Sequence, residues 1–145
     1  MLPFTAVIYG ILAAGAAFLL ESLFLAGVSL TISTFIIGAC IEEGMKFLFL
    51  FQWQRRFLAS YPSALPFRLF AFTLFGIGFA SVEVFLAVPP HIGILLALTS
   101  VHTLTSLLLG YALSVKKLPQ ISLITGFVLA VLIHTAYNVF TASLQ

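Results

Sequence analysis

Charged residues are scarce in this sequence. Of its 145 residues only 7% are Asp, Glu, Lys or Arg, whereas 62% are hydrophobic and the mean hydropathy is +1.23. A soluble globular domain carries about 25% charged residues, so this composition excludes one. The length leaves no room for a separate soluble domain beside the apolar segments. We therefore expect one all-α transmembrane domain, a helix bundle over residues 1–145, in contact with the lipid bilayer.

Cysteine and clustered basic residues are scarce as well. The single cysteine, Cys40, excludes an internal disulfide, and its apolar surroundings favour a small buried thiol without a chemical role. Most of the six Lys and Arg residues are scattered over expected loops. Because they form no stripe that would neutralise phosphates, nucleic acid is excluded as an expected partner. The first residues lack a basic region, so no cleavable signal peptide is expected.

Long apolar runs are abundant, and their interruptions predict five membrane-spanning helices. An apolar helix of roughly 20 residues crosses a bilayer. The runs are broken by Gly27-Val28-Ser29, by the charged and Pro-containing segment 53–66, by Pro89-Pro90 and by Lys116-Lys117-Leu118-Pro119. The expected spans lie near residues 4–26, 30–52, 67–88, 92–114 and 120–142.

The basic residues predict the orientation of these spans. Five alternating spans place the second and fourth connections on the same side of the membrane, and most Lys and Arg residues flank them: Arg55, Arg56, Arg68, Lys116 and Lys117. Cytoplasmic loops of membrane proteins carry the excess of Lys and Arg. We therefore expect a multi-pass cell-membrane protein with its N-terminus in the cytoplasm, and with residues 88–91 and the C-terminus outside.

Several ionisable side chains interrupt the apolar spans. A carboxylate near the bilayer centre costs about 2.5–3.5 kcal/mol, so such residues usually have a functional role. Asn138, one turn after a histidine of the fifth span, adds an amide. The ionisable residues deep in the second to fifth spans are Glu42, Glu43, Glu83, His102 and His134.

Helical spacing predicts that these side chains converge inside the bundle. Of the adjacent Glu42 and Glu43, which point about 100° apart, only one can face a shared cavity squarely. Polar and small residues recur every three or four positions on each span, as Thr34, Gly38 and Glu42 do, and therefore share one face. Small residues allow close helix packing in membranes, so this face is expected to point inward. For Glu83 a hydrogen bond between helices, without catalysis, is the structural alternative.

Other charged residues have structural interpretations. Lys46 lies one turn after Glu42 and Glu43 and would neutralise one of them by pairing. A single pair leaves a second carboxylate unexplained, which favours chemistry at this motif. Glu21, near the outer end of the first span, is expected to pair or to reach the interface. His91 follows two prolines and is expected to be solvated.

The polar segments resemble motifs of a known family. Glu42-Glu43-Gly44-Met45-Lys46 resembles the EExxK motif, and Phe79-Ala80-Ser81-Val82-Glu83 the FxxxE motif, of PrsW-type intramembrane proteases. His102 and His134 follow in the same order. That family is similar to the CPBP proteins, which include the CAAX prenyl endopeptidases and homologues linked to bacteriocin processing. The resemblance covers the second to fifth spans and implies peptide hydrolysis.

The resemblance also implies a role for each catalytic candidate. Glu42 would be the general base that activates a water, and Glu43 would support it. His102 would help to hold the water. His134 and Asn138 would form the oxyanion site, because they match the HxxxN motif of the prenyl endopeptidases.

Glu83 departs from those endopeptidases, which have FxxxH at this point, and so favours the PrsW side over a prenylated substrate. The expected function is an intramembrane glutamic-type endopeptidase acting on a membrane-anchored protein or peptide, with no cofactor and no metal. One alternative is a zinc metallopeptidase, in which carboxylates and imidazoles from four helices bind the ion, since HExxH is missing. The other is a non-enzymatic scaffold, immunity or transport protein that binds a partner, a proton or an ion.

Overall fold

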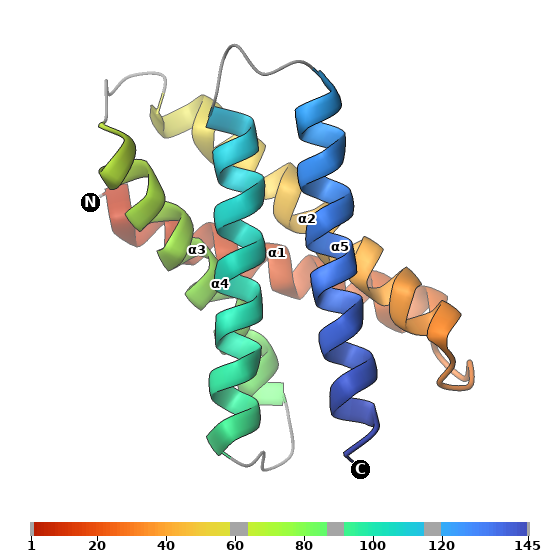
Figure 1. The fold of residues 1–145 in the computed structure, drawn as a ribbon. Helices are drawn as coiled ribbons and strands as arrows, with labels where there is room; N and C mark the ends of the chain where they lie inside the picture. The colour runs from red at the N-terminus through yellow and green to blue at the C-terminus, as the bar shows by residue number, and fades with distance from the viewer. Residues whose placement is uncertain (1, 59–63, 87–91, 115–119, 145) are drawn as a thin grey trace.

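The computed structural model describes residues 2–58, 64–86, 92–114 and 120–144. This part of the chain is helical and contains no strand. A π-helical turn, Gln54–Leu58, continues the second helix. The all-α fold class is confirmed, and the end of every helix lies within two residues of its expected position. The helices are α1 (Leu2–Phe24), α2 (Ile32–Trp53), α3 (Leu65–Leu86), α4 (Ile92–Ser114) and α5 (Gln120–Ala142) (Figure 1).

Four helices of the described chain, α1, α3, α4 and α5, are long and apolar enough to cross a membrane. α2 has a similar length, 22 residues, but it includes Glu42, Glu43 and Lys46. These three side chains are buried inside the bundle. Their burial allows α2 to present an apolar outer face like the other four helices, as charged residues in a membrane require.

The helices form a closed ring, and α2 and α4 also contact each other across it. α1 packs on α3, α3 on α4, α4 on α5, and α5 on α2, which returns to α1 and also contacts α4. In Figure 1, α4 and α5 run side by side, and α1 and α2 pass behind them at a steep angle. Each of the four helices that carry expected site residues therefore packs against at least one other of the four.

Small residues bring α3 close to its two neighbours. Gly76 of α3 faces the backbone of α4, where an added Cβ would lie 2.6 Å from the Cα of Thr103. Gly10 of α1 and Gly78 of α3 leave similar room at the α1–α3 contact. Without a hydrophobic force between helices in lipid, such close backbone approach is a main source of packing energy. It also holds α3 and α4 in a defined register.

A capping box starts α2 after the turn that follows α1. The Thr34 amide donates to Thr31 Oγ1 at 3.3 Å, and the Thr31 amide donates to Thr34 Oγ1 at 2.8 Å. Gly27 has a φ of +77°, a conformation that glycine adopts without strain. This turn and cap together reverse the chain and direct α2 back into the bundle.

The expected burial of Cys40 is wrong, since its side chain is exposed on the outer face of α2. The reason is that a lipid-facing surface is as apolar as a core, so an apolar sequence context does not imply burial. The expected outer segment 88–91, including His91, and the basic pair Lys116 and Lys117 lie outside the described residues.

Candidate active site

Polar side chains from α2, α3, α4 and α5 meet inside the bundle. Four of the six residues expected from the sequence are at most 9% exposed, Glu83 is partly buried, and all five are joined by direct contacts. Asn138 of α5 lines an adjoining cavity instead. The five connected residues are Glu42, Glu43, Glu83, His102 and His134.

The ammonium of Lys46 connects α2 to α4. Its Nζ lies 2.6 Å from Glu43 Oε1, 2.7 Å from His102 Nδ1 and 3.0 Å from Thr105 Oγ1. An ammonium has three hydrogens and accepts no hydrogen bond, so these three contacts use its donors completely. Nζ also lies 4.4 Å from the centre of the Phe79 ring. Lys46 is thus a satisfied buried cation.

These contacts fix the protonation pattern of His102. Because the Lys46 ammonium only donates, His102 Nδ1 must accept, and the ring proton is therefore on Nε2. Nε2 lies 2.9 Å from Glu83 Oε2 and donates to it. Both nitrogens of His102 are consequently engaged, one with α2 and one with α3.

His134 lies between the two adjacent glutamates. Its Nδ1 is 2.8 Å from Glu43 Oε1, and its Nε2 is 3.5 Å from Glu42 Oε2. Glu43 Oε1 already accepts from Lys46 as a carboxylate, so His134 Nδ1 donates to it. Nε2 is then the nitrogen that faces Glu42. The His134 and His102 rings meet edge to face, with centroids 5.0 Å apart.

Glu42 has the least satisfied carboxylate of the set. Its residue is only 9% exposed, and its Oε2 has no hydrogen-bond partner among the described residues. The distance of 3.5 Å to His134 Nε2 is too long for a direct hydrogen bond of normal strength. A bridging water would satisfy both groups, as waters often do where two polar groups are too far apart for a direct hydrogen bond.

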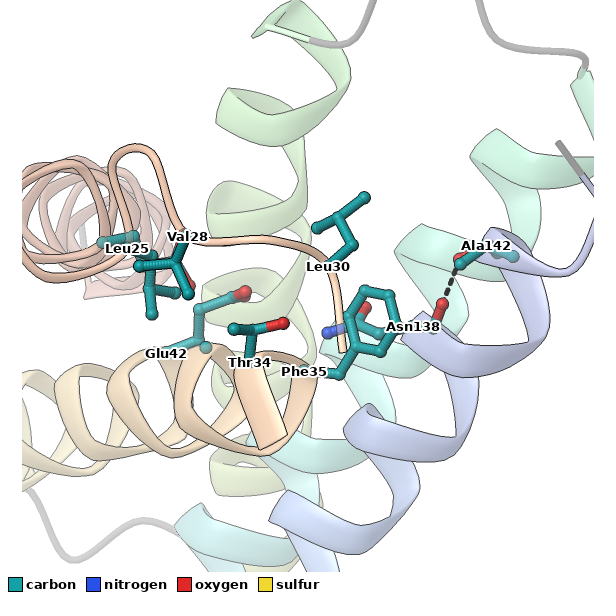
Figure 2. A pocket seen from close by; sticks show the side chains of 11 residues that line it. Leu25, Val28, Leu30, Thr34, Phe35, Glu42, Asn138 and Ala142 are labelled. Carbon is teal, nitrogen blue, oxygen red and sulfur yellow. Dashed lines mark hydrogen bonds between the residues drawn. The ribbon is translucent and has the colours of Figure 1, made fainter. Parts of the chain in front are cut away.

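Two cavities adjoin the Glu42 side chain. The larger, about 340 Å³, lies between the α1–α2 connection and the end of α5, and Thr34 and Asn138 also line it. Figure 2 shows Glu42 and Thr34 pointing from α2 toward that connection, with Asn138 opposite on α5. The smaller cavity, about 170 Å³, is bordered by Glu83 and Glu42. Glu21 lines both cavities.

Two of these residues, Lys46 and Glu21, have a larger part in the site than was expected from the sequence. Lys46 was expected to pair with one glutamate, yet it also binds α4 through His102 and Thr105. The spacing of three residues from Glu43 indicated the ion pair but not the contacts with α4. Glu21 was set aside as an interfacial residue, although it is the only charged residue of α1. That isolation was the signal that a ligand or partner should be sought for it.

A metal ion is one possible occupant of the site. One ligand atom from each of Glu42, His102 and His134 lies within 4.8 Å of the others. However, His102 already uses both nitrogens, toward Lys46 and Glu83. Metal binding would have to displace one of these contacts beside a buried positive charge. The arrangement therefore suits a water held by Glu42 and His134 better than a dication.

No family model matches the chain, and neither the curated proteins nor the solved structures compared with it give a match. The resemblance to PrsW-type proteases accordingly rests on the motifs and their order, and family membership stays a prediction. The geometry adds one independent fact: the glutamates and histidines of those motifs lie in mutual contact across four helices.

Proposed function

We propose that this chain is an intramembrane peptidase that hydrolyses a membrane-anchored protein or peptide with a water activated by Glu42. One observation carries the proposal: the buried, unpartnered Oε2 of Glu42 lies 3.5 Å from His134 Nε2 on the wall of two cavities. A positioned carboxylate beside an imidazole is a suitable general base for water. The proposal includes the membrane orientation expected from the basic loops. In that orientation the larger cavity faces the outside of the cell.

The proposed reaction begins with a water bound between Glu42 and His134. Glu42 takes a proton from this water while the oxygen of the water attacks the scissile carbonyl carbon. The carbonyl oxygen thereby becomes an oxyanion. The Asn138 amide donates a hydrogen bond to that oxygen. Glu42 then returns the proton to the amide nitrogen, the C–N bond breaks, and a carboxylic acid and an amine leave.

The contacts favour a different role for each histidine from the one that the motifs imply. His102, the expected water ligand, has both nitrogens engaged with Lys46 and Glu83. His134 instead directs Nε2 toward Glu42, so we assign to His134 the role of holding the water. His102 is assigned the role of holding the Lys46 ammonium in place. Glu43 orients His134 through Nδ1, as the carboxylate of a catalytic triad orients its imidazole.

Cleavage of a membrane-anchored reporter in proteoliposomes tests the proposal. Glu42→Gln keeps the side-chain shape but cannot take a proton, so cleavage should fall to background while the melting temperature in detergent changes little. His134→Ala should abolish cleavage as well. Cys40→Ala, on the exposed face of α2, is the matched control and should cleave normally. Full cleavage by Glu42→Gln would refute the proposal.

A zinc peptidase is the second candidate, because Glu42, His102 and His134 form a potential ligand set. Metal analysis of the purified protein and an assay after exhaustive chelation separate the two mechanisms. The glutamate mechanism predicts full activity without metal. If chelation abolishes cleavage and added zinc restores it, these three residues must be reassigned as ligands.

A further inference from the structure

Glu21 of α1 lies at the larger cavity, although the proposed reaction does not use it. Its Oε1 is positioned over Gly38 of α2, where an added Cβ would come within 3.3 Å of it. Gly38 and Glu42 are one helical turn apart on the same face of α2. The missing side chain at Gly38 therefore makes room for the Glu21 carboxylate beside Glu42.

Carboxylates line the cavities at Glu42, and no basic side chain of the described residues lines them. Three carboxylates, those of Glu21, Glu42 and Glu83, line them. Lys46, the only lysine among the described residues, directs all three of its hydrogens to Glu43, His102 and Thr105. Neighbouring carboxylates in an apolar place disfavour one another's charged forms, whereas a cationic ligand beside them favours the charged form.

An unpartnered oxygen of Glu42 and the size of the larger cavity also point to a ligand. Glu42 is more than nine-tenths buried, lines both cavities and leaves Oε2 without a hydrogen-bond partner in the described chain. Buried polar atoms are nearly always hydrogen-bonded, so such an atom marks a place for another molecule. The larger cavity, about 340 Å³, is also more spacious than one reacting water of about 30 Å³ requires.

The lining of the larger cavity matches a long basic side chain. Leu25, Val28 and Phe35 provide apolar walls, and Glu21 provides an acidic end that can pair with a cation. Lys and Arg combine an apolar stem with a charged head and pack in such surroundings. A short acidic or an amide side chain would match only part of this lining.

We propose that this cavity binds a Lys or Arg side chain of the substrate, close to the bond that is cut, with Glu21 as the specificity-determining residue. The inference rests on the proposed peptidase function and names its substrate class: a membrane-anchored peptide with a basic residue beside the scissile bond. Asn138, the oxyanion donor of the proposed reaction, lines the same cavity, which places the basic residue beside the scissile bond.

Three membrane-anchored reporters that differ only in Lys, Gln or Glu at one position near the cut test the inference. A charge-assisted hydrogen bond contributes enough for roughly a tenfold to hundredfold preference, so the wild type should cleave the Lys reporter that much faster than the Gln reporter. Glu21→Gln should remove the preference, so that the Lys and Gln reporters are cleaved at similar rates. Glu21→Lys should reverse it in favour of the Glu reporter.

Gly38→Ala provides a milder variant of the same test. Its methyl group would crowd Glu21 Oε1 and should weaken the Lys preference without changing any charge. Gly15→Ala is the matched control, because an added Cβ there meets nothing within 4 Å. If Glu21→Gln slows all three reporters equally, Glu21 serves the reaction and the inference is wrong.

A binding measurement separates this inference from the proposed function. In the Glu42→Gln background, the Lys reporter should bind more tightly than the Gln reporter, and adding Glu21→Gln should remove the difference. If no protein cleaves but this difference is found, the peptidase function fails and the basic-ligand site stands. Equal cleavage of all three reporters by the wild type would leave the function standing and overturn the inference.

Discussion

Each hydrogen of the Lys46 ammonium meets an acceptor, on Glu43, His102 or Thr105. A buried charge is tolerated when its partner and hydrogen bonds offset the lost hydration. Lys46 thereby keeps Glu43 in the carboxylate form that accepts from His134 and keeps His102 in the tautomer that donates to Glu83. One side chain thus determines the hydrogen-bonding direction of both histidines.

Lys46→Met should strongly destabilise the protein. Removing one partner of a buried ion pair leaves the other charge uncompensated and costs about 3–5 kcal/mol. The Glu43→Gln, Lys46→Met double variant should recover part of this loss, since the side chain at position 43 then carries no charge that needs a partner. Thermal unfolding in detergent measures the effect, and Arg56→Met, at an exposed residue, is the control. Equal melting temperatures for Lys46→Met and the control would contradict the prediction.

Asn138→Ala should lower turnover much more than substrate affinity. In the proposed reaction the amide donates to an oxygen that gains its charge only in the transition state. Loss of one such donor lowers kcat by about 10² to 10³-fold. KM should stay nearly unchanged, because ground-state binding is unaffected. Steady-state kinetics with the reporter checks this, and a tenfold rise in KM with normal kcat would assign Asn138 to binding instead.

At the scale of residues, helical spacing predicted which side chains converge but not how they pair. Glu42, His102 and His134 were expected on inward faces, and they meet there. Glu43, which points about 100° away from Glu42 around the helix, is buried against His134 as well. The nitrogen that each imidazole directs to each carboxylate depends on the rotation of four helices about their axes. That rotation results from contacts between helices distant in sequence, which a periodic pattern does not encode.

At the scale of helices, close crossings hold the site together. Gly76 lets α3 approach the backbone of α4 at His102 and Thr103. Glu83 of α3 then reaches His102 Nε2 at 2.9 Å. The polar contact and the glycine contact lie on the same pair of helices, so a change in the crossing should alter the hydrogen bond.

Gly76→Ala should therefore destabilise the bundle and reduce activity together. Its methyl group would lie 2.6 Å from Thr103 Cα and would force the helices apart. Overpacking of this kind typically costs about 1–3 kcal/mol. Gly15→Ala, which meets nothing within 4 Å, should be neutral or stabilising because alanine favours helices. Gly76→Ala should lower the melting temperature, and Gly15→Ala should leave it unchanged or raise it. A stable, active Gly76→Ala protein would contradict the close contact between α3 and α4.

The helix boundaries were predictable for a simple physical reason. Gly, Pro and charged residues between apolar runs mark where a spanning helix must end, and each observed end lies within two residues of its expected place. The steep crossing of α1 and α2 behind α4 and α5 was not predictable (Figure 1). Length and hydropathy fit a helix to a bilayer without specifying its tilt or its neighbours.

At the scale of the whole molecule, the exposed arginines and the larger cavity lie toward opposite ends of α2. Arg55 and Arg56 follow its C-terminal end and are exposed. Glu42 and Thr34 lie in its first half, at the cavity beside the α1–α2 connection. If the arginines face the cytoplasm, as basic loops do, the cavity opens toward the other side. The substrate would then enter from outside.

Thiol labelling in intact cells tests this orientation. In a Cys40→Ala background, a cysteine placed at Asn138 lines the larger cavity and should react with a membrane-impermeant reagent added outside. Arg56→Cys in the same background should stay unlabelled until the membrane is permeabilised, because its side chain is exposed at the opposite end of α2. Cys40 has to be removed first, since its own thiol is exposed. Labelling of Arg56→Cys from outside, with Asn138→Cys protected, would invert the topology and place substrate entry on the cytoplasmic side.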